Sequence, residues 1–315
     1  MKILLTGASS FTGSWFAREL AAAGHEVTAT FQRPADSYDG VRSERVSQVL
    51  ACCEPMHECS FGGEAFMALL SRNRFDLFCH HAADVTDYKS PDFDVTRAVE
   101  HNTRHLREVL ARLAAGGCGR VLLTGSVFEP GEGAGEGDLP AFSPYGLSKG
   151  LTAQMFRYYA GEAGMHLGKF VIPNPFGPWE EPRFTAHLMR KWFAGEPAGV
   201  RTPAYVRDNI HVSLLARAYR RFAEALPSGP GRSRLAPSGY VETQGAFAER
   251  FAKAMRPRLD LPCELDLAHQ SEFPEPKVRI NTDLASAADP DWDEDAAWDE
   301  MAAYYQRVHE VTAQR

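Results

Sequence analysis

The first residues of the chain contain the pattern that most constrains its fold. Lys2–Thr6 is a compact apolar run, and Gly7–Gly13 follows it directly with the sequence GASSFTG. Apolar residues at helical spacing come next, so this segment predicts a strand, a glycine-bearing turn and a helix. A second strand-like run, Glu26–Phe31, follows after Gly24. The N-terminus therefore predicts a β-α-β unit with two parallel strands.

The same alternation continues along the chain. Further strand-like runs are 76–79, 121–124 and 167–172, and helical stretches separate them. Alternating strands and helices predict a parallel sheet covered by helices on both faces. Local patterns predict helices at 95–113, 144–163, 244–255 and 296–308, a strand end and helix at 208–226, and a weak strand at 46–51.

Beyond Pro173 the clean alternation stops. Pro-rich turns divide the chain there into short elements, which fits a smaller lobe. We expect the sheet domain to comprise 1–172, with 205–235 returning to it, and the lobe to comprise 173–204 and 236–315.

The glycine-bearing turn and a second motif point to chemistry. Such a turn lets a dinucleotide pyrophosphate approach the backbone and lie at the helix N-terminus, where N–H groups are free. Tyr145 and Lys149 are four residues apart, so both point to one side of a helix, and a fixed ammonium brings a tyrosine pKa closer to neutral. Ser126 precedes this pair, after the apolar run 120–124. Alone, the spacing also fits an exposed amphipathic turn; with the glycine turn and Ser126 it predicts a proton-transfer site.

Together these motifs resemble the extended short-chain dehydrogenase/reductase family, in particular its nucleotide-sugar epimerases, dehydratases and reductases. The resemblance covers nearly the whole chain and is carried by Thr6–Gly13, His81–Ala83, Asn102, Ser126, Tyr145 with Lys149, Asn174, Gly177–Pro178 and Arg207–Val212. It implies an α/β fold, a Rossmann-type doubly wound parallel sheet with a smaller C-terminal α/β substrate lobe. It also implies an NAD(P)-dependent oxidoreductase that acts on a nucleotide-linked sugar.

The resemblance implies a role for each matching residue. Tyr145 would be the general acid/base, Lys149 would lower its pKa and hold the nicotinamide ribose, and Ser126 would bond the reacting substrate oxygen. Asn102 would hold a relay water near Lys149, and a simple helix-interior asparagine is the alternative. The implied cofactor-binding residues are Thr6, Gly7, Ser9, Ser10, Phe11, Thr12, Gly13, Arg33, His81, Ala82, Ala83, Tyr145, Lys149 and Pro173.

The implied substrate-binding residues are Asp84, Ser126, Asn174 and Arg207. A guanidinium binds a diphosphate through several planar hydrogen bonds that lysine cannot copy. Arg207 stands where the resembling enzymes hold the pyrophosphate of a nucleoside-diphosphate sugar. An ion pair with Asp208 is the alternative interpretation.

Three departures from the family pattern refine these expectations. Ser10 replaces the middle glycine of the turn, so a hydroxymethyl group that could donate a hydrogen bond faces the pyrophosphate. Gln32–Arg33 stands where NAD enzymes carry an acid for the ribose 2′-hydroxyl, which favours NADP over NAD. No Asp-Glu pair follows Ser126. This argues against a dehydratase and leaves a 4-ketoreductase or a 4-epimerase.

Two other classes stay open. A reductase of non-nucleotide ketones or aldehydes belongs to the same family, and a non-catalytic dinucleotide sensor shares the fold. A sensor need not keep Ser126, Tyr145 and Lys149. The Gly- and acid-rich segment 131–140 fits either a loop that closes over substrate or a tolerated surface loop.

Composition and charge argue against several partners. The formal charge is -7 and no basic stripe is present, so we expect no nucleic-acid partner. The N-terminal apolar run is too short for a signal sequence or a membrane span, which predicts a cytoplasmic protein without a membrane partner. Six cysteines without paired spacing and the opposite-facing His80 and His81 predict reduced thiols and no metal site.

The resemblance implies a homodimer through the helices at 95–113 and 144–163.

Overall fold

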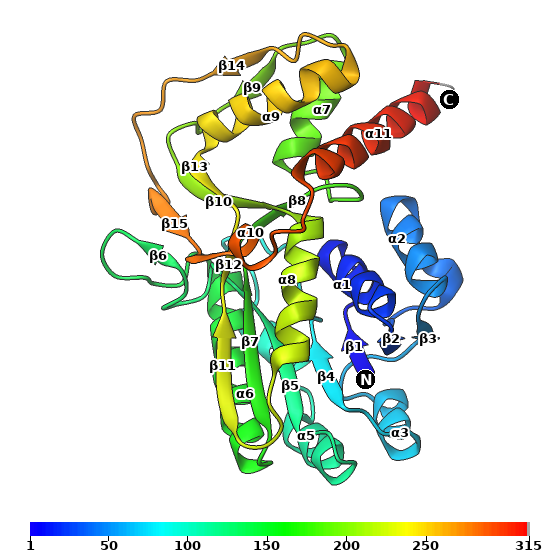
Figure 1. The fold of residues 1–315 in the computed structure, drawn as a ribbon. Helices are drawn as coiled ribbons and strands as arrows, with labels where there is room; N and C mark the ends of the chain where they lie inside the picture. Colours follow the sequence, from blue (N-terminus) through cyan, green and yellow to red (C-terminus); the bar gives the residue numbers. More distant parts are fainter. Residues whose placement is uncertain (314–315) are drawn as a thin grey trace.

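The computed structural model describes residues 1–313, and its central layer is a seven-stranded parallel sheet (Figure 1). The strands are β1 (Lys2–Thr6), β2 (Glu26–Thr30), β3 (Glu54–Met56), β4 (Leu77–His80), β5 (Arg120–Ser126), β7 (His166–Ile172) and β11 (Gly231–Leu235). They lie in the order β11-β7-β5-β4-β1-β2-β3, and every neighbouring pair runs parallel. The order reverses at β1, which confirms the predicted doubly wound Rossmann-type sheet.

Helices cover both faces of this sheet. One face is packed by α1 (Phe11–Ala22), α2 (Gly40–Leu50) and α8 (Val212–Ala225), and the other by α3 (Glu64–Arg72), α4 (Val95–Asn102), α5 (Leu106–Ala115) and α6 (Pro144–Glu162). The side chains of β1 alternate between the two cores, since Ile3 and Leu5 point into the first and Leu4 into the second. In the first core, Phe16 of α1 stacks on Tyr219 of α8 with ring centres 3.9 Å apart. Packing on both sides therefore fixes β1 and the turn that follows it.

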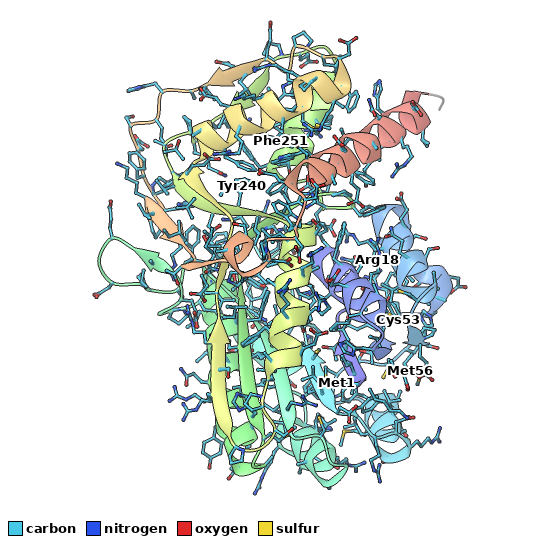
Figure 2. The ribbon with its side chains drawn as sticks, in the orientation of Figure 1. Met1, Arg18, Cys53, Met56, Tyr240 and Phe251 are labelled. Carbon is cyan, nitrogen blue, oxygen red and sulfur yellow. The ribbon has the colours of Figure 1, made fainter. Side chains whose placement is uncertain are left out.

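A second, smaller sheet lies beyond the carboxyl ends of the parallel strands and forms the lobe (Figure 1). Its strands are β6 (Ala134–Gly135), β8 (Asn174–Phe176), β10 (Val206–His211), β13 (Tyr240–Thr243) and β15 (Val278–Ile280). Its helices are α7 (Phe184–Phe193), α9 (Gln244–Leu259) and α11 (Glu294–Ala313), which pack around an aromatic core. Tyr240 and Phe251, labelled in Figure 2, contribute to that core.

Several short elements complete the fold. They are the 3₁₀ turn η1 (Ala35–Ser37), α10 (Ala285–Ala288), and the strand pairs β9 (Ala198–Val200) with β14 (Leu265–Leu267) and β12 (Pro237–Ser238) with β16 (Asp283–Leu284). None of the helices in the described chain is both long and apolar enough to cross a membrane.

The weak strand predicted at 46–51 is wrong. Most of this segment lies in α2, and the short strand β3 follows it. Val46 and Val49 are three residues apart and both are buried in the core beside α1, which is the spacing of one helix face. β-branched residues favour strands, but packing against α1 decides in favour of the helix here.

The other predicted elements are present with small shifts. The helix predicted at 95–113 is divided into α4 and α5, because His105 between them has a left-handed backbone with φ of 52°. The segment 208–226 contains the end of β10 and all of α8. Of the residues 205–235, α8 packs on the large sheet and β11 joins its edge, whereas β10 lies in the lobe sheet.

Candidate active site

The glycine turn after β1 is closed tightly on the chain around it. Gly7 has a φ of 79°, and a Cβ there would lie 2.8 Å from the amide nitrogen of Ala82. A Cβ at Gly13 would overlap the carbonyl oxygen of Gly7. Ser10 is the N-cap of α1, since its Oγ accepts from Gly13 N at 3.1 Å and donates to Gly7 O at 2.9 Å. The Ser10 hydroxyl is therefore used inside the turn rather than pointed at a ligand.

His81 connects this turn to the end of β5. Its Nε2 lies 3.0 Å from Ser10 Oγ and 3.1 Å from Thr12 Oγ1, and its Nδ1 lies 3.0 Å from Thr124 Oγ1. Burial, reinforced by the Lys149 ammonium, lowers the pKa of His81 to about 3, so the imidazole is neutral near pH 7. The Thr6 hydroxyl accepts the N–H groups of His81 and the next residue, each at 3.1 Å.

The neighbouring His80 points the other way. Its ring stacks on Phe156 at 4.8 Å, and its Nδ1 lies 3.1 Å from Thr6 Oγ1. Burial lowers its pKa to about 3 as well, aided by the nearby Lys149. Within the described residues no group of three or more His, Cys, Asp or Glu side chains is arranged to hold a metal ion.

The first turns of α6 place Tyr145 and Lys149 against the end of β5. Ser143 caps the helix by accepting from Gly146 N at 3.2 Å. A Cβ at Gly146 would overlap the carbonyl oxygen of Phe128, so glycine lets α6 contact the segment after β5. The Lys149 ammonium donates to the Thr124 carbonyl at 2.7 Å. Burial lowers the pKa of Lys149 to about 8, which Lys169 reinforces and Glu129 opposes.

Aromatic rings enclose Tyr145. The ring of Tyr88 lies 5.5 Å from it and that of Phe93 lies 5.9 Å from it, both edge-on. Burial raises the pKa of Tyr145, Glu129 and Tyr88 add to the rise, and Arg183 opposes it. The net shift is opposite to the one expected from Lys149, because desolvation dominates and the opposing cation is Arg183.

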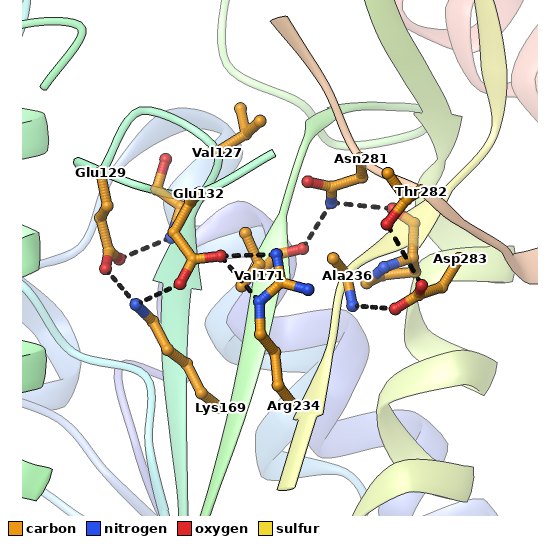
Figure 3. Close-up of polar contacts among 12 residues, drawn as sticks. Val127, Glu129, Glu132, Lys169, Val171, Arg234, Ala236, Asn281, Thr282 and Asp283 are labelled. Carbon is orange, nitrogen blue, oxygen red and sulfur yellow. Dashed lines mark hydrogen bonds and ion pairs between the residues drawn. The ribbon is translucent and has the colours of Figure 1, made fainter. Parts of the chain in front are cut away.

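Ser126 ends β5 above a buried ionic network. Its Oγ accepts from Phe128 N at 3.2 Å, and its N–H donates to Glu129 Oε1 at 2.7 Å. The other Glu129 oxygen binds Lys169 Nζ at 2.5 Å, and Lys169 also binds Glu132 at 2.7 Å (Figure 3). Glu129 is fully buried, and its two oxygens are occupied by these bonds.

The segment after Ser126 is held by further cations. Arg234 donates twice to Glu132, at 2.9 and 2.7 Å, and completes the network in Figure 3. Arg279, which is 1% exposed, donates to the carbonyls of Val127, Glu129 and Pro140. β6, within the segment 131–140, also pairs with β15. These contacts tie both ends of the segment 131–140 to the protein.

Arg207 lies on β10 with its guanidinium already bonded. Its Nη1 donates to the carbonyls of Val206, Pro276 and Lys277, and its Nη2 pairs with Glu275 at 3.0 Å. Burial lowers its pKa, although the Glu275 carboxylate opposes this. The alternative interpretation of Arg207, an ion pair with Asp208, is wrong in its partner, because the pair is made with Glu275.

The neighbours of Arg207 have their own partners. Asp208 instead accepts the N–H groups of Gly239 and Asn281, at 2.8 and 3.0 Å. Asn174, at the start of β8, donates to the Asp208 carbonyl at 3.3 Å.

Asp84 and Asn102 are brought together beside α6. The side-chain oxygen of Asn102, Oδ1, accepts the backbone N–H of Asp84 at 2.8 Å. The side-chain nitrogen of Asn102, Nδ2, lies 3.4 Å from Thr152 Oγ1 on α6. The Asp84 carboxylate lies 3.1 Å from His101, and bonds from Thr86 and His101 lower its pKa even though burial opposes the shift. Both side chains thus have structural partners.

The remaining predicted cofactor residues surround the turn or the strand ends. Phe11 is the first residue of α1 and is buried, while Ser9 and Ala83 are half-buried. Pro173 is buried between β7 and β8. Arg33 is exposed after β2, and within the described chain its guanidinium makes no hydrogen bond or ion pair.

Three residues of this region were not found by sequence reasoning. They are Lys169 and Arg279, which hold the segment after Ser126, and Arg183, which acts on Tyr145. The sequence does contain an indication of Lys169, because it is a single cation within the largely apolar strand His166–Ile172. Arg183 and Arg279 lie in polar stretches that give no such contrast.

The family model described as the NAD dependent epimerase/dehydratase family matches residues 3–235 of the chain. No curated protein matches the sequence significantly.

The fold is similar to those of several solved enzymes. UDP-glucose 4-epimerase from Thermotoga maritima, in a structure with UDP-glucose, gives a TM-score of 0.73 at 18% identity over 98% of this chain and 99% of that chain. UDP-glucuronic acid 4-epimerase from Bacillus cereus, with UDP-glucuronic acid and NAD, gives 0.72 at 16% identity over 98% and 100%. dTDP-glucose 4,6-dehydratase from Streptomyces venezuelae, with NAD bound, gives 0.72 at 16% identity over 99% and 98%. At such identities the likeness shows the fold.

Proposed function

This chain belongs to the NAD-dependent epimerase/dehydratase family, and we propose that it is an NAD(P)-dependent oxidoreductase acting on a nucleotide-linked sugar. The reaction is reduction of a 4-keto group or epimerisation at C4 through a transient ketone. One connected set of contacts carries this proposal. Lys149 bonds the Thr124 carbonyl, the Thr124 hydroxyl lies 3.0 Å from His81, and His81 lies 3.0 Å from Ser10 of the glycine turn. These contacts link Lys149 of the proposed proton-transfer pair to the proposed dinucleotide turn, which supports a single site.

The glycine turn fits a dinucleotide. Phe11 and Thr12 open α1, and their N–H groups have no acceptor within the described chain, as an anion site at a helix N-terminus requires. Lys149 donates one N–H to Thr124 and keeps two for the hydroxyls of a ribose. When bound, the nicotinamide supplies or accepts the hydride. The proposed division places the dinucleotide in 1–172, with 205–235 returning to it, and the sugar nucleotide in the lobe formed by 173–204 and 236–315.

The residues at the substrate oxygen have complementary tasks. Tyr145 transfers the proton, and its raised pKa keeps the phenol protonated near pH 7, which suits donation to a carbonyl oxygen during reduction. Ser126 Oγ accepts the Phe128 N–H, so its own hydrogen is free to bond the same substrate oxygen. Substituting phenylalanine for Tyr145 is expected to lower kcat by roughly 10²-fold or more while leaving dinucleotide affinity unchanged. An unchanged turnover would contradict the role of Tyr145, and a wild type that binds dinucleotide but turns over no substrate would favour the dinucleotide sensor.

The two reactions differ in the fate of the cofactor. A 4-ketoreductase releases oxidised cofactor after each turnover, whereas a 4-epimerase regenerates it while it stays bound. The decisive measurement is turnover of nucleotide sugars by purified protein without added NADPH. Interconversion of epimers under those conditions identifies an epimerase, and strict dependence on added NADPH identifies a reductase.

One observation favours a second candidate, a reductase of ketones or aldehydes that carry no nucleotide. The Arg207 guanidinium is already bonded to three carbonyls and to Glu275, which competes with a diphosphate. Binding of UDP to the Arg207→Ala variant separates the candidates. A nucleotide-sugar enzyme is expected to lose at least tenfold in affinity, and an unchanged affinity supports the second candidate.

We propose a homodimer for the assembly and a cytoplasmic location. α6 exposes three large apolar side chains on its outer surface, Leu147, Leu151 and Tyr158, which are 41%, 44% and 62% exposed. A two-fold interface along α6 would bury them. Light scattering of the wild type and of Leu151→Glu tests this, and a monomeric wild type would contradict it.

A further inference from the structure

Arg183 lies in the loop between β8 and α7, next to the aromatic residues around Tyr145. The carbon of its guanidinium is 6.0 Å from the centre of the Tyr88 ring, and that ring packs edge-on against Tyr145. The charge of Arg183 also acts on the phenol of Tyr145, lowering its pKa against the effect of burial. Arg183 is therefore at the reacting end of the site.

The Arg183 side chain has no polar partner. Its Nε is buried without a hydrogen-bond partner, and within residues 1–313 it takes part in no salt bridge. The two nearby acids are engaged elsewhere. Glu181 pairs with Arg45 at 2.7 Å, and one oxygen of Glu180 accepts from Thr185 and Tyr305. The Arg183 charge acts on both acids, but neither accepts a hydrogen bond from it in the described chain. A buried N–H donor without an acceptor is costly unless a ligand supplies one.

The loop that carries Arg183 is fixed in place. The carbonyl of Trp179 accepts from Arg45 Nε at 2.7 Å, and Arg45 is fully buried on α2. The Trp179 ring lies between Trp15 of α1 and Tyr304 of α11, with ring centres 5.8 and 5.3 Å away. Helices from both halves of the molecule thus hold the start of this loop, which carries the Arg183 guanidinium over the Tyr88 ring.

We propose that Arg183 binds a carboxylate carried by the sugar ring close to its reacting carbon, so that the preferred substrates are nucleotide-linked sugar acids. The planar fork of a guanidinium matches a carboxylate through two parallel hydrogen bonds. A diphosphate is attached at the far side of the sugar from C4, and Tyr88 and Tyr145 place Arg183 at the C4 side. This inference rests on the proposed function.

The test compares two ligands that differ in one carboxylate. The dissociation constants of UDP, UDP-glucose and UDP-glucuronate are measured by calorimetry on the protein loaded with dinucleotide. The wild type is expected to bind UDP-glucuronate at least tenfold more tightly than UDP-glucose. Arg183→Gln should reduce that ratio to near one and leave the affinity for UDP unchanged, while Arg183→Lys should keep part of the ratio. Arg190→Gln, an exposed arginine on α7, is the matched control and should keep all of it.

Three outcomes overturn the inference in distinguishable ways. Equal affinity of the wild type for the two sugars removes the carboxylate preference while leaving the proposed function intact. A loss of UDP affinity in Arg183→Gln equal to its loss for UDP-glucuronate shows that the residue contacts the diphosphate. A wild type that binds none of UDP, dTDP, GDP, CDP and ADP in parallel titrations overturns the proposed function together with this inference.

Discussion

The carboxylate of Glu129 accepts the backbone N–H of Ser126 at 2.7 Å. The same buried carboxylate raises the pKa of Tyr145 and opposes the lowering of the Lys149 pKa. This one acid therefore holds the Ser126 backbone and influences the pKa values of both Tyr145 and Lys149. Both of its oxygens are bonded, one to Ser126 and the other to Lys169.

Replacing Glu129 by glutamine tests this link through pH dependence. The amide can still accept the Ser126 N–H, but the negative charge is lost. Burial still raises the pKa of Tyr145 in this variant, but the Glu129 charge no longer adds to the rise, so the pKa of Tyr145 should fall. We therefore expect the pH profile of kcat/KM to move to lower pH. Glu132→Gln is the control. It also removes a carboxylate from Lys169, but Glu132 does not affect the pKa of Tyr145, so the pH profile of this variant should match that of the wild type. Identical profiles for both variants would contradict the role of Glu129.

Glu180 makes stability depend on pH. Burial raises its pKa to about 7, above the usual value of about 4.3, even though Thr185 and Tyr305 donate to it. The pKa of Glu180 is higher in the folded than in the unfolded chain. Its contribution to stability is therefore fully present below about pH 4 and is lost as the pH rises through about 7. The free energy of unfolding of Glu180→Gln relative to wild type should therefore rise by about 2–3 kcal/mol between pH 4.5 and pH 8.

Chemical denaturation at both pH values measures this gain. Glu196→Gln is the control, because its exposed carboxylate has a pKa that the bond from Lys191 lowers, so no gain is expected. A constant difference between Glu180→Gln and wild type across the range would refute the raised pKa.

Gly13 leaves no room for a side chain. A Cβ would overlap Gly7 O and lie 2.7 Å from Ser10 Oγ, so Gly13→Ala should open the turn. We expect its dinucleotide affinity to fall at least tenfold, which is about 1.4 kcal/mol. Gly161→Ala on α6 meets nothing within 4 Å and should leave binding unchanged while favouring the helix by roughly 0.5–1 kcal/mol. Fluorescence titration with NADPH compares the two, and equal affinities would contradict the fit of the turn.

We expect Arg33 to favour NADP over NAD. Its exposed guanidinium has no partner in the described chain and follows β2, where a ribose 2′-phosphate lies in this class of site. Arg33→Ala should lower kcat/KM with NADPH by roughly 10–100-fold, the scale of a lost charge-assisted bond, and leave NADH unaffected. A wild type that prefers NADH, or a variant that loses both equally, removes the NADP assignment.

Features set by local spacing could be predicted from the sequence. The glycine turn, the strands around it and the Tyr145-Lys149 pair depend on neighbours in the chain, and the structure contains the predicted strands, turn and helix. What escaped prediction depends on distant partners. Arg207 meets Glu275, which is 68 residues away, and the segment 46–51 becomes helical because it packs on α1. The expected lowering of the Tyr145 pKa failed for the same reason, since burial is a property of the folded chain.

α11 contributes Trp298, Met301, Tyr304 and Tyr305 to the core of the lobe, and Tyr305 bonds the buried Glu180. A ribosome makes α11 after every other element described here. During synthesis the parallel strands β1 to β7 can pair while the lobe still lacks one wall of its core. The loop that holds Arg183 is therefore among the last parts of the molecule to reach its final position, and the lobe completes its core only when translation has passed α11.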